Sequence, residues 1–244
     1  MSLENSISAI EKYRPTLGDE RVDFFKGLWE VSERVGSEPL ASRFDRLIGY
    51  LDTFDQGLKA AVEPLDATML SSLDLNAIKA LDVERAAARI IEACGIDPEG
   101  THAPFIELAL VSAVQPDAQR VAAASERDDA QRPSGECPVC GAPAALGILR
   151  DEGQAHGGSR DLWCSLCETT WRFPRIKCAR CGVEHQRELG YRFAEGDPGH
   201  RIYTCDVCSG TLKVVNEAEL GARIDPRVEE IVLEDLLDAV IGAE

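Results

Sequence analysis

The chain has 244 residues, of which 44% are hydrophobic and 28% are charged, with 20 Gly and 12 Pro. This length and composition suit one or two globular domains and exclude collagen-like and wholly disordered chains. The 43 acidic residues outnumber the 26 basic ones and give a formal charge of −17, which repels a phosphate backbone. Nucleic acid is therefore a disfavoured partner.

Neither a membrane span nor a secretory signal is expected. The best apolar run, over residues 106–114, carries Glu107 and is well short of the roughly 18 residues that a bilayer span needs. The opening MSLENSISAIEKYR lacks a basic region followed by an apolar one. We therefore expect a cytoplasmic protein.

The first 130 residues are expected to form an all-α domain. Apolar residues recur there at spacings of three and four, over 24–35, 40–62 and 83–94, and Gly95 suits the end of the third helix. Pro104 suits the first turn of a further helix that runs to about residue 124.

A polar stretch over 126–136 contains Pro133 and Gly135 and is expected to be a linker, whose last part is 131–136. The residues after it favour short strands and metal-held loops, since aromatic, Arg and turn residues alternate there. Asp225 and Pro226 predict the start of a C-terminal helix within 217–244.

Eight of the nine cysteines form four C-x2-C pairs. The pairs are Cys137 with Cys140, Cys164 with Cys167, Cys178 with Cys181, and Cys205 with Cys208. Positions 137 and 178 differ by 41 residues, and so do positions 164 and 205, so the unit C-x2-C-x23-C-x2-C occurs twice. The two units predict two metal modules, over 137–177 and 178–216.

The spacing has a chemical reason. Two residues between cysteines let a tight turn aim both thiolates at one ion, while N–H groups of the turn bind the sulfurs. Gly141 and Gly182 supply backbone freedom just after the first turn of each unit. Two such turns give a tetrahedral four-thiolate site for zinc, or for iron in the rubredoxin manner. All eight cysteines are thus predicted ligands of two ions, one per site.

Two alternatives to this ligand scheme are a disulfide framework and a cross-brace. A disulfide framework is disfavoured, because a long acidic chain without a signal peptide is not typical of secreted disulfide-rich proteins. A cross-brace would join the first pair with the third and the second with the fourth, across 37 residues, whereas pairing within each unit spans 23. Duplication of a self-sufficient unit favours pairing within units, although spacing alone does not fix it.

The metal is expected to be structural first and redox-active second. Small four-cysteine ribbons commonly use metal affinity as folding free energy. A catalytic metal would leave an open position or recruit His, and the sequence has no H-E-x-x-H, G-x-S-x-G or P-loop motif. No catalytic residue is predicted.

The segments CPVCG (137–141), LWCSLCETTW (162–171), RIKCARCG (175–182) and YTCDVCSGTLKVV (203–215) together resemble the FdhE family, the formate dehydrogenase accessory proteins. The resemblance runs from about residue 137 to 240. It implies an α+β protein with a helical N-terminal domain, two tandem rubredoxin-like modules that bind iron or zinc, and a C-terminal helix. The metal-ligand role carries over to each of the eight cysteines.

The resemblance also implies a non-catalytic, cytoplasmic assembly factor. Proteins of this family are needed for respiratory formate dehydrogenase to become active, and they contact its catalytic subunit before export or membrane assembly. That subunit is therefore the expected partner. The acidic N-terminal faces either bind a basic segment of it, such as a twin-arginine region, or serve solubility.

Other polar residues have simpler interpretations. The basic run Arg172, Arg175, Lys177 and Arg180 either docks an acidic partner or offsets the negative metal–thiolate centres. Cys94 is expected to be a buried thiol without chemistry. Solvated loop positions are expected for the four histidines, His102, His156, His185 and His200, because eight cysteines already fill both sites.

Two further functions fit the cysteines. One is a zinc-ribbon regulator or nucleic-acid-binding module, but residues 131–210 hold 10 basic and 10 acidic residues and thus lack a net basic charge. The other is a rubredoxin-like redox carrier, which would need exposed iron and comes here without a flavin or nicotinamide motif. The oligomeric state is not indicated.

Overall fold

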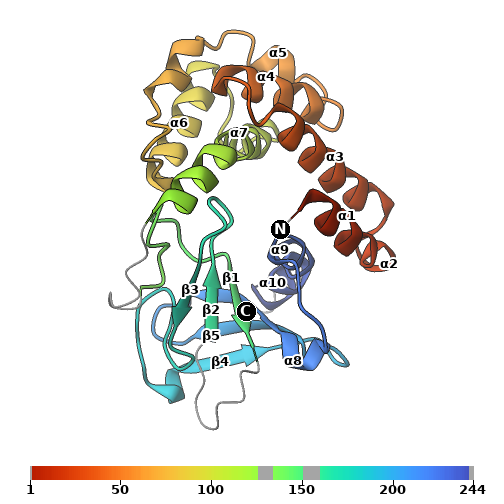
Figure 1. Ribbon diagram of the computed structural model, residues 1–244, viewed down its shortest axis with the longest axis vertical. Helices are drawn as coiled ribbons and strands as arrows, with labels where there is room; N and C mark the ends of the chain where they lie inside the picture. The colour runs from red at the N-terminus through yellow and green to blue at the C-terminus, as the bar shows by residue number, and fades with distance from the viewer. Residues whose placement is uncertain (1, 126–133, 151–159, 242–244) are drawn as a thin grey trace. The chain divides into compact units, whose positions relative to one another are not determined.

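The computed structural model describes residues 2–125, 134–150 and 160–241 (Figure 1). The chain divides into two compact units, one of Gly18–Ser125 and one of Met1–Leu17 with Glu126–Glu244. The first unit is helical, and the second combines a sheet with helices, so the predicted α+β class is confirmed. No helix among these residues has the length and apolarity that a membrane crossing requires.

The helical unit is built from amphipathic helices. Its elements are α3 (Asp19–Val35), α4 (Leu40–Leu51), α5 (Leu58–Ala61), the 3-10 helix η1 (Ala67–Ser72), α6 (Ala80–Ala93) and α7 (His102–Ala124). Helix α4 packs against α3 and α7, and α6 also packs against α7. Leu47, Ile90 and Leu110 are buried at these contacts. The apolar stripes of the sequence thus form the core of this unit.

One expected stripe is interrupted. The apolar pattern over 40–62 is divided between α4, which ends at Leu51, and α5, which begins at Leu58. Gly57 precedes α5 with a φ of 92°, a left-handed conformation that glycine adopts without strain. The chain turns there, so a single helix does not form. Pro104 lies in the first turn of α7, as the sequence predicts.

The two cysteine units form one six-stranded sheet among the described residues. The first contributes β1 (Leu146–Leu149), β2 (Arg160–Trp163) and β3 (Thr170–Phe173). The second contributes β4 (Leu189–Arg192), preceded by the 3-10 helix η2 (Gln186–Glu188), then β5 (His200–Cys205) and β6 (Thr211–Asn216). The order is β3-β2-β1-β6-β5-β4, so each unit supplies three neighbouring strands.

The parallel pairing of β1 with β6 joins the strands of the first cysteine unit to those of the second. All other strand pairs are antiparallel. Gly147 lies at this junction, where a Cβ atom would be only 3.1 Å from the Val214 side chain and 3.2 Å from that of Leu212. The strands of the expected modules, over 137–177 and 178–216, therefore form one sheet.

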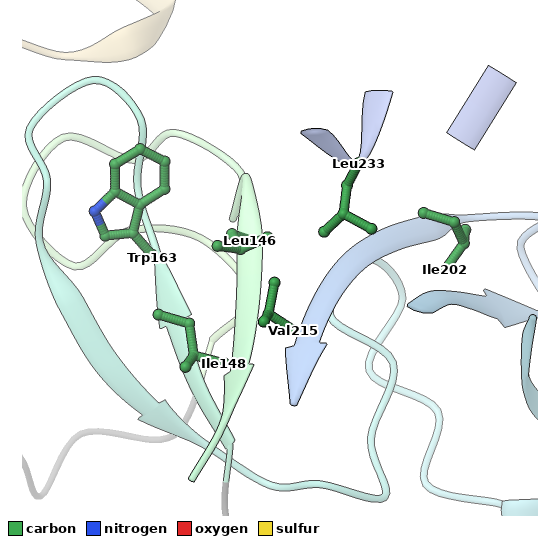
Figure 2. Packing of buried hydrophobic residues seen from close by; sticks show 6 residues of the cluster. All are labelled: Leu146, Ile148, Trp163, Ile202, Val215 and Leu233. Atoms are coloured by element: carbon green, nitrogen blue, oxygen red, sulfur yellow. The ribbon is translucent and has the colours of Figure 1, made fainter. Parts of the chain in front are cut away.

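Both faces of the sheet are covered by apolar side chains. One face carries a buried cluster of Leu146, Ile148, Trp163, Ile202, Val215 and Leu233. Figure 2 shows Leu233 extending from the helical segment toward these strand residues. The opposite face carries Ala144, Leu149, Leu162, Phe173, Leu212 and Val214. Each cluster draws residues from both cysteine units, so the units share their core.

The C-terminal segment forms three helices where one was expected. They are α8 (Glu217–Leu220), α9 (Pro226–Val232) and α10 (Glu234–Ile241). Asp225 caps α9 as predicted, because its side chain accepts a hydrogen bond from the N–H of Arg227. Leu233 separates α9 from α10 and is fully buried against the sheet, which explains the break.

The first 17 residues belong to the same compact unit as the sheet, and α1 (Leu3–Glu11) packs against α9 there. They form α1 (Leu3–Glu11) and α2 (Arg14–Leu17). The Ser6 hydroxyl donates to Asp225 Oδ2 at 2.5 Å, and the Tyr13 hydroxyl donates to Glu229 Oε1 at 2.9 Å. The helical domain expected over 1–130 therefore begins at Gly18 in the structure, because polar contacts with α9 hold the preceding segment.

His200 lies at the centre of this polar contact. Its Nδ1 is 2.7 Å from Asp197 Oδ2, and its Nε2 is 2.8 Å from Glu229 Oε2. The expectation of a solvated loop histidine is wrong here, since His200 is a buried residue of β5. Burial lowers the pKa of His200, but the hydrogen bonds to Glu229 and Asp197 outweigh it, and the net pKa is raised.

The other histidines differ from one another. His102 is half-buried, with Nδ1 2.6 Å from Asp55 Oδ2, and His185 is exposed. His156 lies outside the described residues.

The raised pKa of His200 makes the stability of this unit depend on pH. Its contribution is fully present below the unfolded-state pKa of about 6.5 and is lost as the pH rises through the higher folded-state pKa. We expect His200→Gln to lower the free energy of unfolding by about 2 kcal/mol at pH 6 and by clearly less at pH 9. Urea unfolding of the metal-loaded chain measures both values.

The matched control for this experiment is the exposed residue His185. We expect His185→Gln to leave stability unchanged at both pH values. An equal loss for His200→Gln at pH 6 and pH 9 would contradict a role for the charged imidazole.

Candidate metal centres

The four C-x2-C turns share one backbone geometry. In each turn, the N–H of the first cysteine donates to the carbonyl five residues later. These bonds are Cys137 to Ala142 at 2.7 Å, Cys164 to Thr169 at 3.0 Å, Cys178 to Val183 at 2.8 Å, and Cys205 to Gly210 at 3.1 Å. The duplication visible in the sequence is therefore repeated at the level of hydrogen bonds, and each turn presents both sulfurs on one side.

The residue after each pair is left-handed. Gly141 and Gly182 have φ angles of 77° and 78°, as their place in the sequence predicts. At the second turn of each unit, Glu168 (57°) and Ser209 (53°) hold the same conformation. A Cβ atom makes this conformation unfavourable by about 1–2 kcal/mol. The second turn of each unit is thus strained relative to the first. A glycine after the cysteine pair identifies the left-handed position in only two of the four turns.

The eight sulfurs form two groups of four. The Sγ atoms of Cys137, Cys140, Cys164 and Cys167 lie within 4.8 Å of one another, and the same holds for Cys178, Cys181, Cys205 and Cys208. The cysteines therefore come together within each unit, the grouping that the duplication favours, and not as a cross-brace. All nine cysteines lie among the described residues, and none forms a disulfide.

The spacing of the sulfurs fits a tetrahedral ion. Four sulfurs at 2.3 Å from a central zinc lie about 3.8 Å apart. In the second group, the Cys178–Cys208 and Cys181–Cys205 separations are 3.8 and 3.7 Å. In the first group, the Cys137–Cys167 and Cys140–Cys164 separations are 3.4 and 3.5 Å. Both sets are thus close to the spacing that one ion bound by four thiolates requires.

The two groups differ in exposure. All four cysteines of the first group are buried, whereas Cys181 and Cys208 of the second are exposed. The second group has apolar neighbours that are also exposed, since Val207 between its last two cysteines is 58% accessible. An ion in the first group would be enclosed by protein, and one in the second would lie at the surface.

Hydrogen bonds favour a thiolate in the second group. The N–H groups of Arg180 and Cys181 lie 3.3 and 3.5 Å from Cys178 Sγ. Burial raises the pKa of Cys178, but these backbone donors, together with the Cys181 and Cys205 thiols, outweigh it and bring the pKa to about 7. Such N–H contacts to sulfur are the ones that the C-x2-C spacing predicts, and they stabilise the charged form that binds a metal.

In the first group the thiols act on one another. Contacts with Cys140, Cys164 and Cys167 lower the pKa of Cys137, whereas contacts with Cys137, Cys140 and Cys167 raise the pKa of Cys164. One thiolate in a buried set of four thus opposes a second. A cation at the centre removes this opposition, which favours metal over four neutral thiols.

The basic residues predicted as one run, Arg172, Arg175, Lys177 and Arg180, lie in two different environments. Arg172 Nε lies 3.3 Å from Asp161 Oδ1, and Lys177 Nζ lies 3.1 Å from Glu184 Oε1. Arg175, Lys177 and Arg180 line a cavity that also touches Cys178 and Cys205. Part of the run therefore forms ordinary ion pairs, and part of it lies beside the second sulfur group.

Two contacts of the sulfur groups were not predicted. The Thr169 hydroxyl lies 3.1 Å from Cys167 Sγ, and Arg160 lies in the cavity beside the second group. Neither residue has a sequence signal, since Thr169 falls outside the C-x2-C pattern and Arg160 is distant from Cys178 along the chain. Cys94, expected to be buried, is half-buried at the end of α6, and burial raises its pKa.

The strain at Ser209 can be measured. We expect Ser209→Gly to relieve the left-handed backbone and to raise the stability of the metal-loaded chain by about 1 kcal/mol. Thermal and urea unfolding provide the readout. Gly182→Ser, which adds the same strain at the matching position of the other turn, should lower stability by a similar amount. A neutral or destabilising Ser209→Gly would show that this turn is not strained.

The difference in burial predicts two rates of metal loss. With zinc in both groups and a chelator in excess, we expect the exposed second site to release its ion at least about tenfold faster, because the buried site opens only by local unfolding. Absorbance of the zinc–chelator complex follows both phases.

Variants assign the two phases of metal loss. Cys181→Ser should remove the fast phase and Cys140→Ser the slow one, while Cys94→Ser, outside both groups, should change neither. Release of two ions at a single rate would contradict the assignment.

Comparisons with known proteins place this architecture. Residues 136–175 match the family model described as FdhE, central domain. A protein named Protein FdhE homolog from Stutzerimonas stutzeri is 42% identical over 78 residues, 32% of this chain and 25% of that protein. One of the same name from Aquifex aeolicus is 32% identical over 95 residues, 39% of this chain and 33% of that protein. The matching segments thus span only a quarter to a third of these curated relatives.

A solved structure resembles the chain over nearly its whole length. The crystal structure of the FdhE protein from Pseudomonas aeruginosa has a TM-score of 0.58 and 21% identity, covering 99% of this chain and 90% of that one. This likeness shows a shared fold. Together with the match over 136–175, it confirms the resemblance to FdhE: the chain has an FdhE-type fold, and the residues that hold its first four-cysteine group match the FdhE central domain.

Proposed function

We propose that this protein is a non-catalytic accessory factor for the maturation of formate dehydrogenase, which binds the catalytic subunit of that enzyme in the cytoplasm. The observation that carries the proposal is the pair of four-cysteine groups on one sheet. It comes in a chain whose fold resembles that of an FdhE protein and whose residues 136–175 match the FdhE central domain. The eight cysteines offer eight ligands for two tetrahedral ions. Their geometry supports a rigid binding module and leaves no ligand position for a substrate.

The eight cysteines are the proposed ligands of two ions, either iron or zinc. Thiolates accept both metals, so availability in the cell decides between them. Bound zinc would supply folding free energy, and bound iron would also allow a one-electron change of oxidation state without loss of a ligand. The turn N–H groups at Cys178 would hold the thiolate in place in either case.

The difference in burial between the two sulfur groups suggests different roles, one structural and one in binding a partner. All four cysteines of the first group are buried, which suits a purely structural ion. The second group exposes Cys181 and Cys208, and Val207, adjacent to Cys208 in the chain, is 58% exposed. Ile176 and Tyr191, 45% and 52% exposed, line the cavity that Cys178 and Cys205 border. Exposed apolar side chains around a partly exposed centre are typical of an interaction surface. We propose that the client, the catalytic subunit of formate dehydrogenase, binds this side of the module.

A second candidate function is electron transfer. The exposure of Cys181 and Cys208 favours it, because electron exchange with a partner requires a centre near the surface. The two functions differ in their dependence on the metal. An accessory factor that uses the metal for folding would work with zinc, whereas an electron carrier would require iron.

The test is an anaerobic affinity purification of the tagged full chain. The chain is expressed in the cells from which it comes, grown under conditions in which they respire formate. We expect the formate dehydrogenase catalytic subunit to co-purify with the wild-type chain and with Cys94→Ser, which lies outside both groups. Loss of the fold is monitored by circular dichroism.

The double variant Cys178→Ser/Cys181→Ser should lose the client and the formate dehydrogenase activity of the cells while its helical signal persists. If the double variant recovers as much client as Cys94→Ser does, the second group has no role in binding. Recovery of nucleic acid or polymerase in place of the client would overturn the proposal. Activity restored by iron-loaded but not by zinc-loaded protein would favour electron transfer.

A further inference from the structure

Arg160 is a buried cation with an unusual environment. It is 2% exposed at the start of β2, and its guanidinium carbon lies 5.3 Å from the Phe173 ring centre and 5.4 Å from that of Tyr203. Its Nη2 donates to the carbonyl of Lys177 at 2.7 Å, while Nε is buried without a hydrogen-bond partner. A buried donor left unpaired costs about 1–3 kcal/mol.

The other buried arginines of the described chain have carboxylate partners. Arg43 pairs with Asp117, and Arg201 Nη2 lies 3.5 Å from Glu219 Oε1. Arg160 has no ion pair with any described carboxylate, and the pKa of its side chain is lowered to about 10 by burial. At neutral pH it therefore remains a buried cation whose counter-charge is not supplied by an acidic side chain.

Arg160 lines a cavity of about 180 Å³ on the sheet face opposite α9 and α10. The cavity also touches Arg175, Lys177 and Arg180, and its lining contains no Asp or Glu. Acidic residues outnumber basic ones in this chain by 43 to 26. A lining with four cations and no carboxylate is thus the reverse of the overall composition and creates a local positive potential.

The second sulfur group accounts for part of this charge. Cys178 and Cys205 border the cavity, and a zinc ion held by four thiolates would carry a net charge of −2. Lys177 is also paired with Glu184. The centre and Glu184 together offset the cations only partly, and with iron(III) the centre would offset even less. An excess of positive charge therefore remains in the cavity.

The shape and the other lining residues limit what fits. The cavity has room for a group of a few heavy atoms, and Thr204, Thr211 and Tyr203 add polar atoms to its wall. At its border, the exposed side chains of Ile176 and Tyr191 offer an apolar surface to whatever carries that group. Arginine binds planar carboxylates and phosphates with two parallel hydrogen bonds, which suits both anions.

We propose that this cavity is an oxyanion site, in which Arg160, Arg175 and Arg180 bind a carboxylate or phosphate group. The group is either a free small anion or part of a larger molecule that rests on Ile176 and Tyr191. The cavity borders Cys178 and Cys205, but the anion would be held by the arginines and not by any cysteine. The oxyanion site does not depend on whether the chain assists formate dehydrogenase.

The test is a titration of the zinc-loaded full chain, followed by ¹H–¹⁵N NMR. Sodium acetate, inorganic phosphate and sodium chloride are added separately at matched ionic strength. We expect acetate, phosphate or both to produce saturable shifts of the Arg160 Nε–H signal and of the amides of residues 175–180. Chloride should produce none of comparable size. Which of the two oxyanions saturates tells a carboxylate site from a phosphate site.

Variants of exposed residues keep the experiment independent of folding. Arg175→Gln and Arg180→Gln should each weaken binding by about tenfold, the loss expected for one hydrogen bond to a charged group. Arg192→Gln changes an exposed arginine of the same module outside the cavity and should bind as the wild type does. Linear shifts with every salt, or equal affinity in all four proteins, would overturn the proposal.

Discussion

The gathering of four cysteine sulfurs within each module is the constraint on which the sheet unit depends. The strands are only four to six residues long, and three such strands bury too little surface to be stable without support. Each module is closed by two turns of identical hydrogen bonding that direct four sulfurs to one point. The spacing of the sulfurs, near 3.8 Å in the second group, is that of a tetrahedral metal site.

The pairing of β1 with β6 turns two such modules into one body. The last strand of the second module lies beside the first strand of the first, and both sheet faces then carry apolar clusters drawn from both modules. Helices α9 and α10 cover one face, where Leu233 is fully buried (Figure 2). The opposite face is left with the aromatic and arginine side chains that surround the cavity. The division of the two faces thus separates a structural side from a binding side.

The local parts of this architecture could be predicted from sequence. A C-x2-C turn is a local structure, so its two ligands and the role of Gly141 follow from spacing alone, and the repeat of 41 residues indicates which cysteines share a site. Glu168 and Ser209 could not be identified as left-handed, because neither residue type marks that conformation. The apolar stripes of α3, α6 and α7 could also be predicted, since the buried positions of a helix recur with a regular period.

The distant contacts had no such signal. The parallel junction of β1 and β6 depends on Gly147, whose close packing against Val214 cannot be inferred from a single glycine. The docking of residues 1–17 depends on Ser6 and Tyr13, polar residues of an otherwise ordinary amphipathic helix. Arg160 likewise becomes notable only when the strands bring it between Phe173 and Tyr203.

If both sulfur groups bind metal as complete four-thiolate sites, each chain holds two ions. X-ray absorption spectroscopy of the full chain, purified without oxygen and combined with elemental analysis, tests it directly. We expect two ions per chain, each surrounded by four sulfurs at about 2.3 Å. One ion per chain, or a first shell in which nitrogen or oxygen replaces sulfur, would contradict it.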